Sequence, residues 1–389
     1  METKLVKLGD VAVINPRLRL EKNEVARKIP MEALTPFQKK IDSYSFEKYS
    51  GGVKFQNGDT LVARITPSLE NGKTSYVDIL ESDEVAFGST EFIVMRANKS
   101  VLDQEYLYYI TTSDDFRQVA IQSMTGTSGR QRVQNEAVSN YELELPQLDI
   151  QRQIVFVLDA LDNKIELNQR INENLLNLAT MYFDKWVENT KSKSVTSLDK
   201  IATYQNGIAM QKFPPTSDND FLPVLKIREL NQNRIDNNSN VVTSDIKDSV
   251  IVHDGDLIFS WSGTLLAKLW TGGNAALNQH LFKVTSAEYP KWFYYLWTLR
   301  HLREFQHIAA DKKTTMGHIK RRDLTNAKVV IPSEREFTDL DRLLNPIIEQ
   351  MINNGIESRR LTRVRTLLLP KLLAGQINLS NIETVMNNA

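Results

Sequence analysis

Two long segments of the chain place apolar residues at spacings of three and four, the pattern of one face of an amphipathic helix. The first runs from Pro146 to Val187 and the second from Pro332 to Leu373. At about 1.5 Å per residue, a helix of about forty residues would span about 60 Å, more than the width of a small domain. We therefore expect the two helices to pack on each other.

Each apolar stripe contains one asparagine, Asn168 or Asn354. A polar residue inside a helical seam commonly fixes the register of the pairing, so the pattern indicates coiled-coil character. The apolar members of the two stripes are Ile154, Leu158, Leu161, Ile165, Ile171, Leu175, Leu178 and Tyr182, and Leu340, Leu344, Ile347, Met351, Leu361 and Leu368.

The two helical segments belong to an internal repeat whose copies lie 186 positions apart, the offset from Pro146 to Pro332. A hydrophobic strand that ends in proline precedes each helix, at Tyr141–Pro146 and at Ala327–Pro332. A duplicated unit indicates a pseudo-symmetric molecule, which usually binds a partner that itself has two parts.

Each copy also predicts a mixed α and β domain before its long helix. A Gly-Asp pair leads into an alternating apolar strand in both copies, and such a pair is typical of a turn that enters a strand. These segments are Phe55–Lys73 and Ile251–Leu269, followed by strands at Glu91–Ala97 and His280–Ser286 and by aromatic-rich helices at Gln104–Gln122 and Pro290–Ala309. We interpret the tyrosine pairs of the two aromatic helices as core residues.

The predicted fold is α+β, with two pseudo-repeated mixed α/β domains separated by two long helices packed as an antiparallel coiled coil. The length of 389 residues also favours at least two domains. The predicted boundaries are 1–145 and 193–331 for the two mixed domains, 146–192 for the first helical segment, and 332–389 for the second with the C-terminal tail.

Composition excludes several classes of protein. The chain has no cysteine, which removes disulfides, thiolate metal sites and cysteine nucleophiles. No apolar signal segment or membrane-spanning run is present in the sequence, so we expect a cytoplasmic protein with no membrane partner. The 48 basic and 48 acidic residues cancel, which argues against a protein that simply coats DNA.

Catalytic motifs are absent from the sequence. There is no phosphate-binding loop of the GxxxxGK[ST] type, no GxGxxG after a strand, and no metal-binding spacing among the five histidines. Neither Asn15-Pro16 nor Asn345-Pro346 continues into the segment that an amino-methyltransferase needs. We therefore expect no catalytic residue, no metal and no cofactor.

Polar loops at corresponding places in the two copies are the candidate nucleic-acid contacts. Arginine suits guanine edges, glutamine suits adenine, and serine, threonine and lysine suit phosphate oxygens. One pair of loops follows the Gly-Asp strands, and the other precedes the proline-ended strands. The candidates are Arg64, Thr66, Ser68, Asn71, Lys73, Thr127, Ser128, Arg130, Gln131 and Arg132 in the first copy, and Ser260, Ser262, Thr264, Lys268, Lys312, Lys313, Thr314, Thr315, His318 and Lys320 in the second.

A row of basic residues on the second long helix comprises Arg359, Arg360, Arg363, Arg365 and Lys371. It would suit phosphate groups or an acidic protein partner, and an ordinary solvated helix face is an equal alternative.

In this order, and repeated, these segments resemble the specificity subunit of a type I restriction–modification system. The resemblance rests on the Leu-Gly-Asp-Val-Ala opening at Leu8, the Gly-Asp strands, GTSGRQRV before ELELP, the helix start at Gln151–Ile154 and the C-terminal segment Leu367–Leu379. The second copy departs from the pattern at its helix start, where Glu336 and Phe337 stand, and Pro346 lies within its helical run.

The resemblance implies two target recognition domains, each of which reads one half of a bipartite double-stranded DNA site. It also implies that the helices dock two methyltransferase subunits, that a restriction subunit completes the nuclease, and that the chain itself is not an enzyme. Two readers on a rigid spacer would place the half-sites about one helical turn apart, about 34 Å. The alternatives are a self-contained DNA-modifying enzyme and a scaffold that binds only protein.

Overall fold

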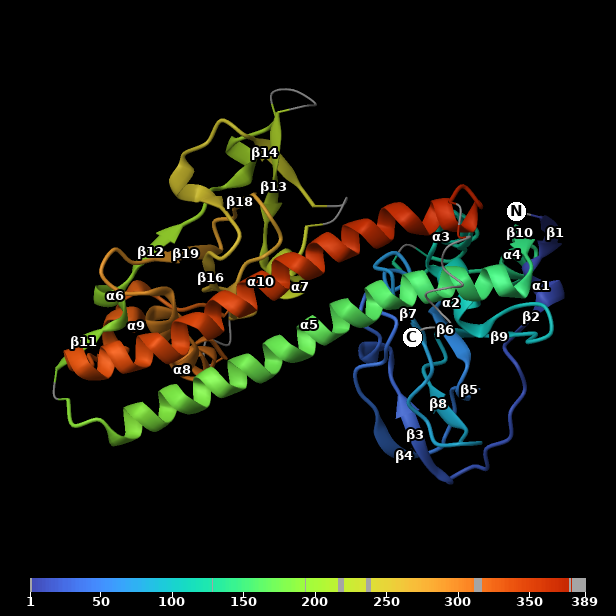
Figure 1. Cartoon of the computed structure of the whole chain (residues 1–389), viewed down its shortest axis with the longest axis horizontal. Coiled ribbons are helices and arrows are strands. Elements are labelled where there is room, and N and C mark those ends of the chain that lie inside the picture. The colour runs from blue at the N-terminus through green and yellow to red at the C-terminus, as the bar shows by residue number, and fades with distance from the viewer. Residues whose placement is uncertain are drawn as a thin grey trace. The chain divides into compact units, whose positions relative to one another are not determined.

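The computed structural model describes residues 2–127, 129–192, 194–215, 220–235, 239–310, 317–377 and 379. The chain divides into two compact units, Met1–Asn163 with Thr362–Ala389, and Lys164–Leu361. Two long helices, α5 (Leu148–Asn189) and α10 (Glu334–Leu373), each contribute one part to each unit (Figure 1). The predicted α+β fold with two long helices is confirmed.

Among its described residues, the first unit contains two four-stranded sheets and a two-stranded ribbon. The first sheet has the order β2-β9-β6-β7 and is antiparallel throughout. The second has the order β4-β3-β8-β5, in which β3 and β8 run parallel. The ribbon joins β1 to β10. The strands are β1 Thr3–Lys7, β2 Ala12–Ile14, β3 Val25–Ile29, β4 Ser45–Lys48, β5 Val53–Phe55, β6 Asp59–Ala63, β7 Thr74–Tyr76, β8 Ala86–Gly88, β9 Phe92–Ala97 and β10 Glu142–Pro146.

The described part of the second unit repeats this topology strand for strand. Its sheets have the orders β12-β19-β16-β17 and β14-β13-β18-β15, again with one parallel pair, β13 with β18, and the ribbon joins β11 to β20. The strands are β11 Val195–Ser197, β12 Thr203–Asn206, β13 Phe221–Leu225, β14 Val241–Thr243, β15 Ile251–Val252, β16 Leu257–Ser260, β17 Ala267–Leu269, β18 Ala275–Leu277, β19 Leu281–Thr285 and β20 Lys328–Val330. The repeat inferred from sequence is therefore a repeat of structure.

The Gly-Asp pairs work in the same way in both units. Each glycine has a left-handed backbone that glycine adopts without strain, with φ of +88° at Gly58 and +86° at Gly255. Each aspartate then accepts a hydrogen bond from a backbone amide three residues earlier and pairs with a cation on the neighbouring strand. The ion pairs are Asp59 with Arg96 (2.7 Å) and Asp256 with Lys283 (2.9 Å).

The aromatic helices differ between the two units. The segment predicted as one helix in the first unit is two, α2 (Gln104–Thr112) and α3 (Asp114–Gln122), because Ser113 adopts an extended backbone and caps α3. The corresponding α8 (Lys291–Ala310) is continuous. Tyr108, Tyr109, Tyr294 and Tyr295 are all buried, as expected for core residues. The short helices are α1 Leu8–Val11, α4 Asn135–Ser139, α6 Leu198–Ile201, α7 Ile227–Gln232 and α9 Arg321–Asn326, with 3-10 turns at Met31–Ala33, Met210–Lys212 and Asp248–Val250.

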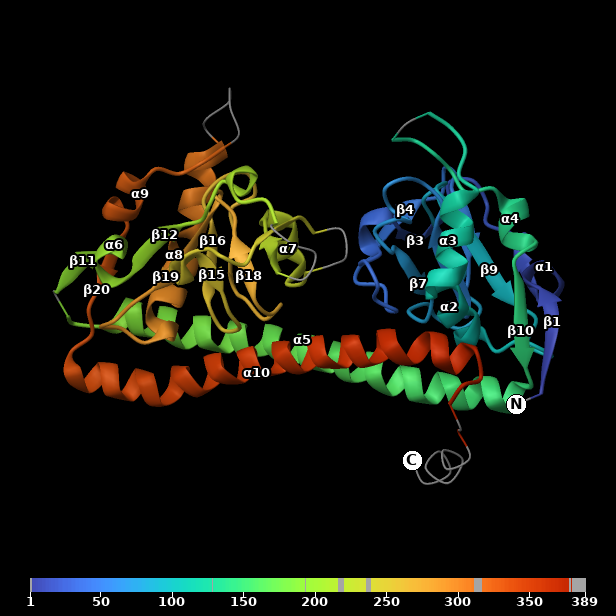
Figure 2. The same ribbon diagram turned by 90° about the horizontal axis from the view of Figure 1, so that it is seen from above.

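Within the second unit, α5 and α10 run antiparallel side by side (Figure 2). The two seam asparagines lie in one polar layer. Asn168 donates to the Glu357 carboxylate (2.7 Å) and Asn354 donates to Asn172 (2.9 Å), which itself donates to the Met351 carbonyl (2.9 Å). Residue numbers rise on α5 as they fall on α10, which fixes the antiparallel sense.

The predicted apolar stripe of α5 holds as far as Leu175, which packs against the core, and is wrong at Leu178 and Tyr182. Leu178 and Tyr182 are 37% and 40% exposed, and their neighbours Ala179 and Phe183 are buried instead. The prediction kept alternating steps of three and four, whereas a straight α-helix averages 3.6 residues per turn, so the buried face drifts by one residue.

The start of α10 is held by a capping box. The Ser333 hydroxyl accepts from the Glu336 amide (3.5 Å), and the Glu336 carboxylate accepts from the Ser333 amide (2.9 Å). The same carboxylate binds Trp186 and Thr190 on the chain near the end of α5, at 3.1 Å and 2.8 Å. Glu336, where the second copy departs from the first, therefore ties the two helices together in this unit, and α10 continues through Pro346.

Candidate nucleic-acid interface

In the first unit, backbone hydrogen bonds join the two candidate loops into one surface. The Thr66 amide donates to the Gln131 carbonyl (3.0 Å), and the Val133 amide donates to the Arg64 carbonyl (2.8 Å). Ile65 and Arg132 form an antiparallel bridge between them. The loop after β6 and the loop before α4 are therefore neighbours, although about sixty residues of chain separate them.

A charged cluster lies where the two loops meet. The Arg132 guanidinium donates to both carboxylate oxygens of Glu91, at 2.6–3.1 Å, and the Arg64 amide donates to the Glu91 carbonyl (2.9 Å). The hydrogen bonds from Arg132 hold the pKa of Glu91 below its usual value and raise that of Arg132. Because 46% of the Arg132 side chain stays exposed, its outer face remains free to meet a ligand.

The other candidates of the first unit differ in availability. Asn71, Thr127 and Arg130 are exposed, whereas Lys73 donates to the Met31 carbonyl (2.7 Å) and is partly buried. Of the remaining candidates, Thr66 donates to the Met124 sulfur (3.3 Å), Ser68 and Gln131 are partly buried, and Ser128 lies outside the described residues.

The second unit builds the same frame. The Ile319 amide donates to the Trp261 carbonyl (3.0 Å), the Gly263 amide donates to the Gly317 carbonyl (2.8 Å), and Ser262 bridges His318. The Trp261 amide approaches the His280 carbonyl (3.4 Å), as the Arg64 amide meets Glu91. The loop after β16 is therefore joined to the segment before α9 as its counterpart is in the first unit.

The side chains on this second frame are aromatic instead of charged. The Trp261 ring lies 6.0 Å from that of His280 and 6.5 Å from that of His318, measured between centroids. Ser262 hydrogen-bonds the Nδ1 atom of His280 (3.0 Å). Where the first unit has an arginine–glutamate pair, the second has an indole between two imidazoles.

The remaining candidates of the second unit also divide by exposure. Ser260 and Ser262 were predicted to contact DNA, but both are buried and neither presents its hydroxyl on the surface. Lys268 donates to the Asn231 carbonyl (2.6 Å), and burial lowers its pKa. Thr264 and Lys320 are exposed. Lys312, Lys313, Thr314 and Thr315 lie outside the described residues.

Two cluster members, Glu91 and His280, were not among the candidates. Both stand immediately before the inner strand of their sheet, β9 or β19, opposite the residue that follows the Gly-Asp strand. Their position just before a predicted strand could have identified them from the sequence, because it places each side chain at the same sheet edge as the candidate loop.

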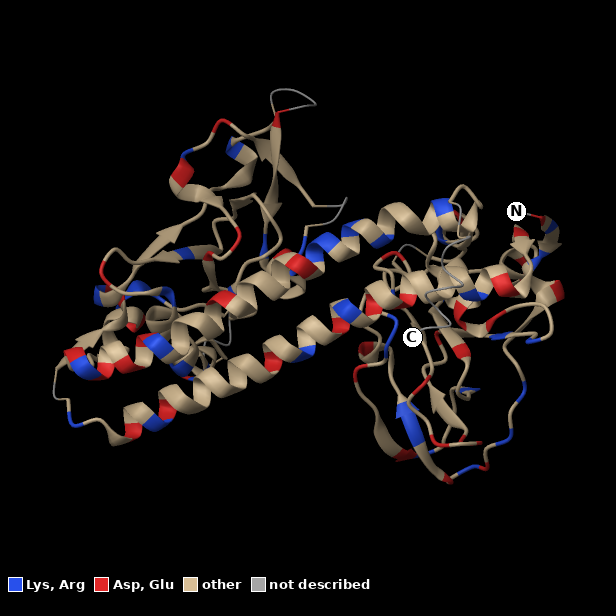
Figure 3. Cartoon of the chain, in the orientation of Figure 1, with Lys and Arg blue, Asp and Glu red and all other residues tan. Residues whose placement is uncertain are grey.

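Basic residues recur along the C-terminal half of α10 (Figure 3), and two of them are engaged in ion pairs. In the second unit, Arg359 forms a bidentate pair with Asp254, at 2.6 Å and 2.7 Å. In the first unit, Arg365 binds Asp162 (2.5 Å) and the Phe37 carbonyl (3.3 Å), so neither guanidinium is free for phosphate. Arg360, Arg363 and Lys371 are exposed and keep the surface role available.

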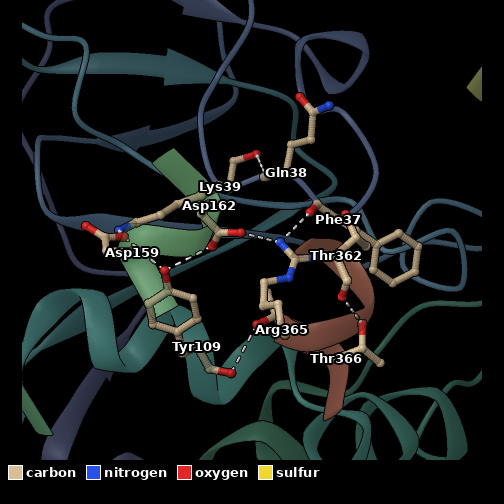
Figure 4. A network of polar contacts seen from close by, with 11 residues as sticks. Phe37, Gln38, Lys39, Tyr109, Asp159, Asp162, Thr362, Arg365 and Thr366 are labelled. Atoms are coloured by element: carbon tan, nitrogen blue, oxygen red, sulfur yellow. Dashed lines mark hydrogen bonds and ion pairs between the residues drawn. The ribbon is translucent and has the colours of Figure 1, made fainter. Parts of the chain in front are cut away.

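The Arg365 pair belongs to a polar network inside the first unit (Figure 4). The Tyr109 hydroxyl lies 2.9 Å from Asp159 and 3.0 Å from Asp162, and Lys39 pairs with Asp159 and Glu105. Burial chiefly raises the pKa of Tyr109, so its hydroxyl stays protonated and donates.

Other ligand types find little support in the described part of the chain. No group of three or more histidine and carboxylate side chains there is arranged to hold a metal ion. None of the helices that the structure describes combines the length and apolarity of a bilayer span.

Comparison with known proteins identifies the family. Residues 2–177 and 191–363 each match the type I restriction modification DNA specificity domain. The chain is 22% identical over 304 residues to the MjaIX specificity subunit of Methanocaldococcus jannaschii, covering 72% of this chain and 70% of that protein. It is 21% identical over 406 residues to the HindI specificity subunit of Haemophilus influenzae, covering 83% and 87%.

A solved structure shares the fold. The S subunit of a type I restriction–modification system from M. genitalium matches with a TM-score of 0.51 and 13% identity, over 95% of this chain and 96% of that one. The two domain matches together span most of the sequence, and their limits agree with the repeat seen in the strand order. The chain therefore belongs to the type I restriction–modification DNA specificity family and is a non-catalytic specificity subunit that carries this domain twice.

Proposed function

We propose that this subunit binds a bipartite double-stranded DNA site and reads one half of it with each repeat. The observation that carries the proposal is one backbone frame with two different sets of side chains. The joined loops of the first unit carry Arg64, partly buried, and Arg132, exposed, and those of the second carry Trp261 and His318, both partly buried. A duplicated reader that must recognise two different half-sites needs a constant scaffold and variable contacts.

The exposed candidates have the chemistry for this task. The Arg130 fork matches the acceptors of guanine in the major groove, and the Asn71 amide matches adenine. Thr127, Thr264 and Lys320 are exposed and suit phosphate oxygens. The recognition domains in this proposal are residues 1–145 and 193–331.

The helical segments, 146–192 and 332–389, are proposed to dock two methyltransferase subunits, with a restriction subunit joining for cleavage. Several large apolar side chains of these helices are exposed, which is typical of a surface that another protein covers. Examples are Leu167 (49%), Met181 (59%), Leu343 (38%) and Leu367 (56%). If the partner subunits supply part of the positive surface around the DNA, this chain itself needs no net positive charge. A DNA-binding complex of this kind would act in the cytoplasm.

A domain exchange tests the modular reading. Replacing residues 1–145 by the first domain of another family member, in a complex with its methyltransferase subunits, should change one half of the methylated sequence and leave the other half. Replacing 193–331 is the matched experiment and should change the opposite half. Inserting a few residues into either long helix should alter only the spacer. A first-domain exchange that changes both halves, or methylation without sequence preference, would refute the proposal.

A charge swap tests the role of Arg132. The double variant Glu91→Arg/Arg132→Glu keeps the ion pair but turns a carboxylate toward the DNA, so binding should weaken by roughly tenfold or more. The matched control swaps Lys28 and Glu47, an ion pair of 2.9 Å on β3 and β4, and should bind DNA like the parent. Equal affinity for both swapped proteins would show that Arg132 only holds the loops together.

A further inference from the structure

The two repeats carry opposite net charges outside the long helices. Residues 1–145 contain 18 basic and 21 acidic residues, whereas residues 193–331 contain 18 basic and 13 acidic residues. The zero net charge of the chain therefore combines a first domain of net charge −3 with a second of net charge +5. Where this difference lies in the fold bears on how each domain meets DNA.

One face of the second unit, built from α6, α9 and the start of β20, has a close counterpart in the first unit. α6 and α9 lie side by side (Figure 2), and the Leu198 amide donates to the Ala327 carbonyl (3.0 Å). In the first unit α1 lies against α4, and the Leu8 amide donates to the Tyr141 carbonyl (2.8 Å) at the start of β10. The two faces therefore share one backbone arrangement.

The charge changes sign between matched positions of these two faces. Lys200 is the third residue of α6 and Asp10 is the third residue of α1. Arg322 is the second residue of α9 and Glu136 is the second residue of α4. All of these residues are exposed. The basic face of the second unit comprises Lys200, Lys320, Arg321, Arg322 and Lys328, and the first repeat has Asp10, Gln134, Asn135, Glu136 and Glu142 in their places, all exposed as well.

The carboxylates within the elements of the basic face already accept hydrogen bonds from the protein. Asp323, whose side chain is 11% exposed, accepts from the Lys320 amide at 2.7 Å. Asp199 accepts from the Thr325 hydroxyl at 2.6 Å. The Arg322 side chain is 76% exposed and comes only within 3.9 Å of Asp323, so its guanidinium is available to an anion from solution.

The basic face adjoins the loops that we assign to the second half-site. Lys320 directly follows Ile319, whose amide donates to the Trp261 carbonyl (3.0 Å). The Arg321 guanidinium lies over the Phe282 ring, 5.5 Å from its centroid, and the Trp261 ring lies 5.8 Å from the same ring. The basic face is therefore continuous with the surface that carries Trp261.

We propose that the basic face binds the DNA phosphates that flank the half-site read by the second repeat, and that the first repeat makes no matching contact. This inference rests on the proposed function, because it divides the backbone contacts of the same complex between the two repeats. Lysine and arginine beside a reading loop hold a protein on the DNA backbone without reading sequence. The second repeat then contributes most of the salt-dependent affinity, whereas the carboxylates of the first repeat repel phosphate.

An acidic surface of a partner protein is the other polyanion that such side chains would suit. Two copies of one methyltransferase subunit would need like surfaces on the two repeats, but the charge of this face changes sign between them. The two halves of a bipartite DNA site need not be held alike. DNA therefore accounts for a basic face on one repeat alone.

The test measures how DNA binding by the complex of this chain with its methyltransferase subunits depends on salt. A fluorescent duplex that contains the methylated sequence is titrated at about 50 to 300 mM sodium chloride. Lys200→Asp/Arg322→Glu gives the second unit the residues of the first. It should weaken binding at low salt by at least about tenfold and reduce the slope of log affinity against log salt by about 2, because each phosphate contact contributes about 0.9.

Two further double variants separate the place of the charge from its total. Lys22→Glu/Lys99→Glu makes the same change of net charge at exposed positions before β3 and after β9, the strand ends opposite to Glu91, and should change the slope by less than about 0.5. Asp10→Lys/Glu136→Arg gives the first unit the basic residues of the second and should steepen the slope by about 2. Circular dichroism checks that each protein is folded.

An unchanged slope in Lys200→Asp/Arg322→Glu, or an equal loss in Lys22→Glu/Lys99→Glu, would overturn the proposal. So would no gain in Asp10→Lys/Glu136→Arg. Weaker assembly with the methyltransferase subunits at an unchanged slope would assign the basic face to an acidic protein surface instead.

A second duplex that lacks the methylated sequence separates this proposal from the proposed function. Lys200→Asp/Arg322→Glu should weaken both duplexes by the same factor, because phosphate contacts carry no sequence information. A parent complex that binds both duplexes equally would refute the reading of half-sites, and the slopes would still decide whether the basic face meets phosphate.

Discussion

The buried pair of Asp162 and Arg365 gives the sharpest test of how the first unit is held to its helices. Their side chains are 9% and 16% exposed, and Asp162 also accepts from the Tyr109 hydroxyl at 3.0 Å (Figure 4). Asp162→Asn keeps the shape but leaves a buried guanidinium without its counter-charge. Breaking a buried pair in this way costs about 3 kcal/mol.

The expected loss can be assigned to one unit. All five tryptophans, at positions 186, 261, 270, 292 and 297, lie in the second unit. In urea, the first unit of the Asp162→Asn protein should unfold at a lower urea concentration than in the parent, as followed by far-ultraviolet circular dichroism. The tryptophan fluorescence transition, which reports the second unit, should keep its midpoint. A cost of about 3 kcal/mol corresponds to roughly 8 °C in melting temperature for a unit of this size.

Two controls separate charge from packing. Asp184→Asn breaks the half-exposed pair with Arg300 in the second unit and should have little effect, because exposed ion pairs contribute little. Asp162→Leu/Arg365→Met removes both charges and should recover much of the stability lost by Asp162→Asn. If Asp162→Asn costs no more than Asp184→Asn, or shifts the tryptophan transition equally, the reasoning fails.

Three further outcomes are expected. Hydrogen bonds from Ser333, and then from Thr190 and Trp186, lower the pKa of Glu336 to about 2. Because this folded pKa lies below the unfolded value, the ionised Glu336 stabilises the protein fully above pH 4.5, and this stabilisation is lost as the pH falls toward 2. Glu336→Gln should therefore make the free energy of unfolding depend less on pH in this range. An unchanged pH dependence would contradict the assignment. Ser113→Ala removes the α3 cap and should cost about 1 kcal/mol in thermal denaturation, whereas no loss would mean that the amide of α3 finds another acceptor. Asn168→Leu should preserve the melting temperature but loosen the register of the two helices. The register can be measured as the yield of a disulfide between Asn172→Cys and Met351→Cys, introduced into this cysteine-free chain, and the yield should be lower with Asn168→Leu than with Asn168. Equal yields would refute a register role.

Local pattern was enough to predict the long helices, the Gly-Asp strands and the proline-ended strands, because their causes are local. A Gly-Asp pair needs only one left-handed residue and one carboxylate to begin a strand, and it did so at Gly58 and Gly255. The long helices follow from the spacing of apolar residues, and the repeat follows from comparison of the chain with itself. The absence of catalytic motifs is also a property of sequence.

What the tertiary structure decided depends on contacts between distant segments. The candidate loops around Arg64 and Arg132 become one surface only through hydrogen bonds across the sheet edge, and Glu91 enters only because β9 begins immediately after it. Arg359 and Arg365 look alike on a helix, yet each guanidinium is engaged by a carboxylate far away in sequence, Asp254 or Asp162. Sequence thus determined the repeated elements and their order, whereas burial and long-range pairing, which no local spacing encodes, decided which side chains remain free to bind.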